Sequence, residues 1–239
     1  MSSSTLLSLL SISLFLPAVL ALAISPIDHF CLSANFTPNS TYNKNLNNLL
    51  SYLDYTTPLT GFSNGSVGLS QNETYGLALC RGDINSSFCK ACVDQASSDI
   101  QKLCPLKKGA VVWYEFCELK YSNLDFFGQI DNGDWFYQVN PNESSNPAYF
   151  NKEVISLLSK LEEEAIKSPK LYADGAQCIG NSTTIYGLVQ CTRDLSSANC
   201  KACLTEAINV VPDLLGRLGA KIWGGSCNVR YEIYQFYTA

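Results

Sequence analysis

The chain is poor in the residue types on which most enzymes and nucleic-acid-binding proteins depend. Its 239 residues include one histidine and one methionine, and only 15% of them are charged. The single histidine, His29, lies close to the expected start of the mature chain, so a histidine general base held deep in a site is not expected. The formal net charge of −5 argues against nucleic acid as a partner, because phosphate binding requires a basic surface.

Long hydrophobic runs are also missing, except near the amino terminus. Residues Leu6 to Leu22 are apolar apart from three serines and Pro17, and Ala21-Leu22-Ala23 suits cleavage by signal peptidase. We therefore expect a signal peptide over residues 1–23 and no membrane span in the chain that follows. This pattern predicts a secreted, extracellular protein.

Acceptor sites for N-linked glycans support the same compartment. The sequence holds seven Asn-x-Ser/Thr motifs, at Asn35, Asn39, Asn64, Asn72, Asn85, Asn142 and Asn181. One such motif is weak evidence, but seven behind a signal peptide predict a glycosylated surface.

Cysteine is the abundant residue, with eleven copies. The spacing Cys-x8-Cys-x2-Cys occurs at 80/89/92 and again at 191/200/203. A redox pair would need a βαβ setting, and zinc would need more thiolates or histidines. Structural disulfides are the interpretation that the oxidising compartment favours, and no metal or cofactor is expected.

The cysteine motif is part of an internal repeat with a separation near 110 residues. Tyr75-Gly-Leu-Ala-Leu-Cys80 matches Tyr186-Gly-Leu-Val-Gln-Cys191, and the matches continue downstream in the same order. The paired residues are Asp83 with Asp194, Trp113 with Trp223, Cys117 with Cys227, and Tyr121 with Tyr231. The repeat predicts two homologous domains in tandem.

A polar segment rich in Asn, Gly and Pro separates the repeats. We expect a first domain at 27–135, a linker at 136–145 and a second domain at 146–239. Each repeat has a leucine pattern with helical spacing, a short helix starting at its Cys-x-x-Cys, and β-forming residues near its end, including Tyr231 to Tyr237. The predicted fold class is α+β, with each antiparallel sheet covered by one or two helices and stapled by disulfides.

The duplicated cysteine motif, the Tyr-Gly-Leu-x-x-Cys before it and the segment Cys227 to Tyr237 resemble the plant ginkbilobin-homologous domain. Two such domains behind a signal peptide resemble the cysteine-rich repeat secretory proteins. The resemblance implies the disulfides Cys31–Cys104, Cys80–Cys89, Cys92–Cys117, Cys191–Cys200 and Cys203–Cys227. It leaves the second domain without a third bridge, because Leu215 stands in the place of Cys104, and we expect that domain to be the less stable one.

Cys178 has no partner in this scheme and lies in a polar segment expected to be a loop. An odd cysteine in an exported protein leaves three alternatives open: an inert buried thiol, a free reactive thiol, or a homodimer linked through Cys178.

The resemblance also implies a sugar site, because one family member is a mannose-binding antifungal lectin. The contact positions are held by Leu32, Val111 and Ser122 in the first domain, which does not suit sugar hydroxyls. In the second domain Lys221 and Glu232 are a partial match. The alternative for these two residues is a surface salt bridge across neighbouring strands.

These observations predict a noncatalytic recognition protein of the plant apoplast, acting in defence or stress responses. Its partner would be a protein or a cell-wall or fungal glycan. The alternatives are a mannose-binding antifungal lectin and an extracellular thiol/disulfide redox sensor. We expect no enzyme activity, since no catalytic constellation is found.

Overall fold

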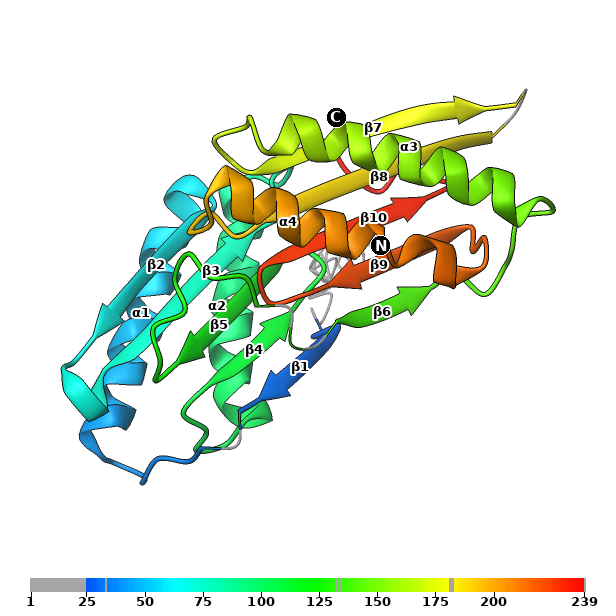
Figure 1. Ribbon diagram of the computed structural model, residues 1–239. Helices are drawn as coiled ribbons and strands as arrows, with labels where there is room; N and C mark the ends of the chain where they lie inside the picture. Colours follow the sequence, from blue (N-terminus) through cyan, green and yellow to red (C-terminus); the bar gives the residue numbers. More distant parts are fainter. Residues whose placement is uncertain (1–24, 33, 132, 134, 181–182, 239) are drawn as a thin grey trace, which may run out of the picture.

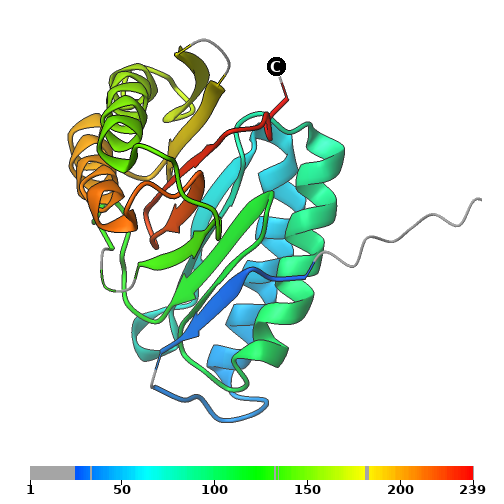
Figure 2. The ribbon, with the colours of Figure 1, turned by 90° about the vertical axis from the view of Figure 1, so that its right-hand side faces the viewer.

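The computed structural model describes residues 25–32, 34–131, 133, 135–180 and 183–238. The expected signal peptide and Asn181 lie outside the described residues. Two similar halves each contain one sheet and two α-helices, and Figure 2 shows the helices on the two outer sides with the sheets between them. The predicted tandem α+β fold is confirmed.

The first half contains β1 (Asp28–Cys31), α1 (Thr41–Thr60), β2 (Phe62–Val67), a 3-10 turn η1 (Ser70–Asn72), β3 (Thr74–Cys80), α2 (Ser86–Leu103), β4 (Ala110–Trp113) and β5 (Cys117–Ser122). The second contains β6 (Phe136–Val139), α3 (Pro147–Ala165), β7 (Tyr172–Ile179), β8 (Thr183–Cys191), α4 (Ser197–Ile208), a 3-10 turn η2 (Val211–Leu214), β9 (Gly219–Trp223) and β10 (Cys227–Glu232). The sheets have the orders β1-β4-β5-β3-β2 and β6-β9-β10-β8-β7, and their paired strands are antiparallel (Figure 1).

The long helices form where the leucine pattern predicts them. In α1 the buried side chains Leu46, Leu49, Leu50 and Leu53 recur at helical spacing, and Ser40 caps the helix by accepting a hydrogen bond from the Asn43 backbone. In α3 an equivalent apolar face begins after the Asn146 cap, with Pro147 in the first turn. Each helix therefore buries one face against its own sheet.

The glycine of the repeated Tyr-Gly-Leu motif lets this helix lie close to the sheet. A Cβ at Gly76 would be 2.8 Å from Leu49 Cδ2, and a Cβ at Gly187 would be 2.9 Å from Leu161 Cδ1. Both distances are shorter than real Cβ contacts allow, so a larger residue at either position would force the packed leucine or the strand to shift.

Disulfides tie the shorter helices to the sheets. Five bridges join Cys31–Cys104, Cys80–Cys89, Cys92–Cys117, Cys191–Cys200 and Cys203–Cys227. These are the pairs that the family resemblance implies, and the second domain has two bridges against three in the first.

Three sequence-based boundaries differ from the structure. The expected linker 136–145 contains β6, which pairs with β9 and so belongs to the second sheet. The expected strand to Tyr237 ends at Glu232, because the last residues leave the sheet and reach the first domain. The cysteine-containing helices begin three residues before Cys89 and Cys200, after capping residues Asn85 and Ser196.

Candidate functional site

The uncovered faces of the two sheets meet between the domains, and Lys221 lies at this interface. It is on β9, opposite Arg230 of β10 in the strand register. Its Nζ is 2.7 Å from Oε2 of Glu115, which comes from the turn between β4 and β5 of the first domain. Lys221 is therefore paired across the interface, and the expected surface salt bridge to Glu232 is wrong.

Glu232 is also paired. Its Oε1 accepts hydrogen bonds from Arg230 at 3.2 Å, and the residue is only 5% exposed. Arg230 in turn lies 2.5 Å from Glu115 Oε1, and its guanidinium stacks on the ring of Phe236 at 3.9 Å. Lys221 and Glu232 are thus linked to one another through Glu115 and Arg230.

Arg81 completes this arrangement from the first domain. Its Nε atom lies 2.6 Å from Asp83 Oδ1, and its Nη1 atom lies 2.9 Å from Glu115 Oε1. Burial raises the pKa of Glu115, but the positive charges of Arg230, Lys221 and Arg81 outweigh burial and hold that pKa below its ordinary value. We call these six residues the interdomain charge cluster: Arg81, Asp83, Glu115, Lys221, Arg230 and Glu232. Its three cations and three carboxylates balance, so it has no charge left to offer a ligand.

Sequence reasoning missed Glu115 and Arg81. The repeat alignment contains a signal for Glu115, since it occupies the position of Gly225 in the second domain. A charged residue aligned with glycine in a tight turn marks a difference between the two halves, although it does not say what the charge contacts.

In the first domain, the positions that the family resemblance implies for a sugar site come together in a different environment. Leu32, Val111 and Ser122 all line a cleft of about 430 Å³ on the uncovered face of the first sheet. The cleft lies between this face and residues 124–131, and Gly225 of the second domain also lines it. Its lining is largely apolar, in agreement with the expectation that these three residues do not suit a sugar.

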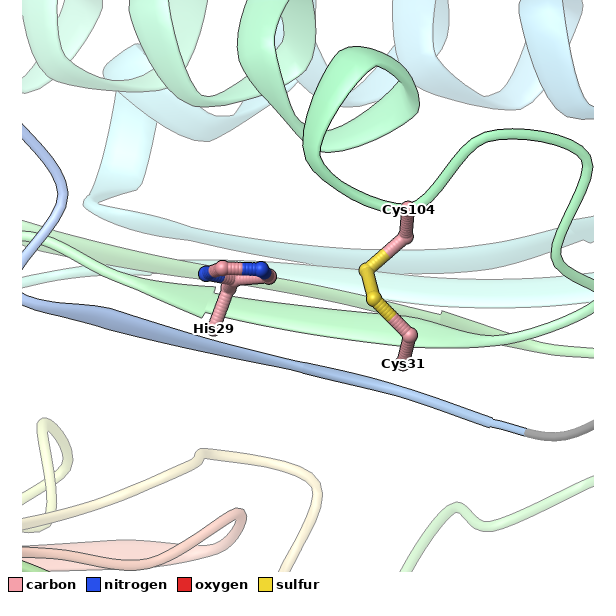
Figure 3. Close-up of side chains that lie close together, drawn as sticks. All are labelled: His29, Cys31 and Cys104. Carbon is pink, nitrogen blue, oxygen red and sulfur yellow. A yellow bond between two sulfur atoms is a disulfide. The ribbon is translucent and has the colours of Figure 1, made fainter.

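His29 lies beside the Cys31–Cys104 disulfide, on the side of β1 toward α2 (Figure 3). The imidazole and the two sulfur atoms lie within 4.8 Å of one another, which is close enough for metal ligands. The sulfur atoms are bonded to each other, however, so neither is a thiolate that can bind a metal. A single imidazole remains, and the group does not fit a metal site.

Cys178 lies on β7 and not in a loop. It pairs with Thr184 of β8 in the register, and its thiol is exposed. The polar sequence around it fits a strand at the edge of the sheet, where side chains face water. The interpretation as a buried thiol is wrong, while the reactive thiol and the disulfide-linked homodimer stay predictions.

The predicted glycan acceptors differ in exposure. Asn35, Asn39, Asn85 and Asn142 are exposed, and Asn64 and Asn72 are half-buried. Asn85 uses its side-chain oxygen to cap α2, which leaves its amide nitrogen for a glycan. Glycan occupancy stays a prediction.

Within the described residues, no helix combines the length and the apolar character needed to cross a membrane.

The comparisons with known proteins agree on one family. The salt stress response/antifungal family model matches residues 30–124 and again 138–234. The antimicrobial ginkbilobin-2-like protein of Castanea crenata is 47% identical over 234 residues, covering 97% of this chain and 96% of its own. Cysteine-rich repeat secretory protein 38 of Arabidopsis thaliana is 46% identical, covering 87% of this chain and 84% of its own.

A solved structure shows the same tandem arrangement. The tandem DUF26 ectodomain of the Arabidopsis thaliana cysteine-rich receptor-like protein PDLP8 has a TM-score of 0.78 and 27% identity, and the match covers 89% of this chain and all of that one. The homologues are secretory proteins and receptor ectodomains, and this protein is accordingly secreted and extracellular. With two matched domains that span most of its length, the chain belongs to the salt stress response/antifungal family, also called DUF26.

Proposed function

We propose that this protein is a noncatalytic recognition protein of the apoplast that binds a protein partner in antifungal or stress responses. The observation that supports this choice over mannose binding is the interdomain charge cluster. Lys221 and Glu232 already have ionic partners, and Glu232 is nearly inaccessible to solvent. A sugar is neutral, so displacing these ionic partners would leave the largely buried charges of Lys221 and Glu232 without a counter-charge.

The relatives support an extracellular binding role. One is named an antimicrobial protein, and the solved neighbours are ectodomains of receptor-like proteins. The many contacts between the two domains also support a preformed surface, because a surface that is already ordered loses less entropy when a partner binds.

Binding to a glycan array and to intact cell surfaces tests this proposal. We expect no binding to mannose, either by the wild-type protein or by Glu232→Ala. We expect binding to plant or fungal cell surfaces to be lost after the surfaces are treated with protease and to be retained after treatment with mannosidase. Mannose binding that Glu232→Ala abolishes would instead establish the lectin alternative.

Redox sensing is a second candidate function, and the exposed thiol of Cys178 is the observation that favours it. Oxidant-dependent dimerisation that disappears in Cys178→Ser would support this function. A protein that stays monomeric and keeps its free thiol after oxidant treatment would exclude it.

A further inference from the structure

The cleft on the first domain has the dimensions of a small-molecule site. Its volume of about 430 Å³ falls within the range of roughly 300–1,000 Å³ that is typical of ligand pockets. The cleft is bounded by β1, β4 and β5 on one side, and residues 124–131 close it on the other. It also lies at a domain interface, which is a frequent position for such sites.

Most of the cleft wall is aromatic or aliphatic. The wall residues of this kind include Phe30, Leu32, Val111, Trp113, Leu124, Phe126 and Ile130. Phe30 and Leu32 are 43% and 37% exposed, which places apolar surface in contact with water. A ligand that covered this surface would be stabilised by removing its apolar area from water.

Among the described residues of the lining there is one lysine, and it has its own partners. The Lys120 ammonium group is paired with the Asp131 carboxylate and lies 4.6 Å from the centre of the Phe126 ring. Asp125 adds a second carboxylate to the lining. The charged groups among the described lining residues therefore sum to −1, and an anionic ligand would meet no unpaired cation among them.

Few of the described lining residues carry a neutral polar group that could face a ligand. Ser122 and Gln129 supply a hydroxyl and an amide to the lining. Two such groups suit a molecule with one or two hydrogen-bonding atoms. They do not suit a sugar, whose many hydroxyls would lose their hydrogen bonds to water against an apolar wall.

From these observations we propose that the cleft binds an uncharged, ring-containing, largely apolar small molecule with a single hydroxyl or carbonyl group. The aromatic walls contributed by Phe30, Trp113 and Phe126 favour a planar ring, and Ser122 or Gln129 would receive its polar atom. This inference does not rest on the proposed protein partner, so either proposal can fail without the other.

Two ligands of matched shape test the charge argument. We expect 2-naphthol, which is uncharged at mildly acidic pH, to bind saturably to the full mature protein with a change in tryptophan fluorescence. We expect 2-naphthoate, which has a similar ring system but a negative charge, to bind at least about tenfold more weakly. Equal or tighter binding of the carboxylate would overturn the proposal.

Three variants locate the binding. Leu32→Glu places a charge at the cleft, and Val111→Phe reduces its volume with an apolar side chain. We expect each to weaken 2-naphthol binding by about tenfold or more. Leu69→Glu is the matched control, because Leu69 is 81% exposed and is not part of the cleft lining.

The expected control result is wild-type affinity in Leu69→Glu. Thermal melting of all variants verifies that they are folded, and Val111→Phe keeps the test decisive if the charged variant does not fold. Wild-type affinity in both cleft variants, or binding that does not saturate, would overturn the proposal.

Discussion

Glu118 has an unusual environment for a carboxyl group. It lies on β5 at the domain interface, is only 4% exposed, and neither of its oxygens has a hydrogen-bond partner among the described residues. Burial raises its pKa to about 8, and the negative charges of Asp131 and Asp194 act in the same direction against the opposing charge of Lys120. The folded protein therefore holds Glu118 in its protonated form at acidic pH.

This raised pKa predicts a loss of stability as the pH rises. The contribution of Glu118 to stability is fully present at a pH below 4.5, the ordinary pKa of a glutamate. It is lost as the pH rises from there to about 8, the pKa of Glu118 in the folded protein. Thermal melts across this range should show the melting temperature of the wild type falling relative to that of Glu118→Gln. Parallel pH profiles for the two proteins would contradict the assignment, and Glu143→Gln, at an exposed carboxylate, should follow the wild type.

Cys178 is the free thiol among the described cysteines, and its exposure predicts its reactivity. We expect iodoacetamide to label one site per chain without denaturant, and Cys178→Ser to remove that labelling. Mass spectrometry measures the number of adducts. Labelling that appears only after unfolding would show that the thiol is protected, and a dimer on a non-reducing gel would show that it has formed an intermolecular bridge.

At the scale of whole elements, the disulfides differ in the length of chain that they close. Cys31–Cys104 joins β1 to the end of α2 across a separation of 73 residues, whereas Cys80–Cys89 spans only 9. In the chain-entropy account, a longer loop restricts the unfolded chain more.

We therefore expect the Cys31→Ser/Cys104→Ser double variant to lose about 4 kcal/mol of unfolding free energy, and the Cys80→Ser/Cys89→Ser variant to lose about 2.5 kcal/mol. Denaturant titration of the two variants under identical conditions measures both losses. If the short-loop variant loses more, the strain or packing at each bridge outweighs loop length.

The sequence identified the elements whose pattern is local. The leucines of α1 and α3 and the doubled cysteine motif predicted the helices, the tandem repeat and the α+β class. The strand β6 was missed because it has only four residues and most of them are exposed. Only its pairing with β9 makes it a strand. The charge cluster was missed for a similar reason, since Glu115 and Arg230 are 115 residues apart and meet only after the domains have docked.

In the whole molecule, two hairpin turns hold the domains together, and they do so by different means. In the second domain the turn contains Gly225. A Cβ at this position would lie 2.5 Å from Asp131 Oδ2, and because glycine has none, the turn can approach the Lys120–Asp131 pair closely. In the first domain the equivalent turn projects Glu115 onto the opposite sheet, where it reaches Lys221 and Arg230. The interface therefore has one tightly packed turn and one charged turn.

Further hydrogen bonds cross the interface, one at the turn of the second domain and two away from both turns. Trp113 Nε1 donates to Gly224 O at 3.2 Å, Gln190 donates to Cys80 O at 3.0 Å, and Arg193 donates to Thr60 O at 2.8 Å. Because the domains share so many contacts, we expect the wild-type protein to unfold in a single cooperative transition.

Glu115→Gln should weaken this coupling more than any exposed charge substitution. The change removes the carboxylate that Arg81, Lys221 and Arg230 share, and Lys221 has no other ion pair among the described residues. We expect a loss of about 3 kcal/mol, because breaking a largely desolvated ion pair leaves uncompensated charge at the interface.

Calorimetry should then resolve two transitions in Glu115→Gln, with the second domain melting first because it has two disulfides against three in the first. The control is Glu143→Gln, whose carboxylate lies 3.2 Å from Arg217 and is half exposed, and which should cost about 1 kcal/mol or less. A single unshifted transition in Glu115→Gln would mean that the packed turn at Gly225 and the hydrogen bonds around it are sufficient to join the domains without the charge cluster.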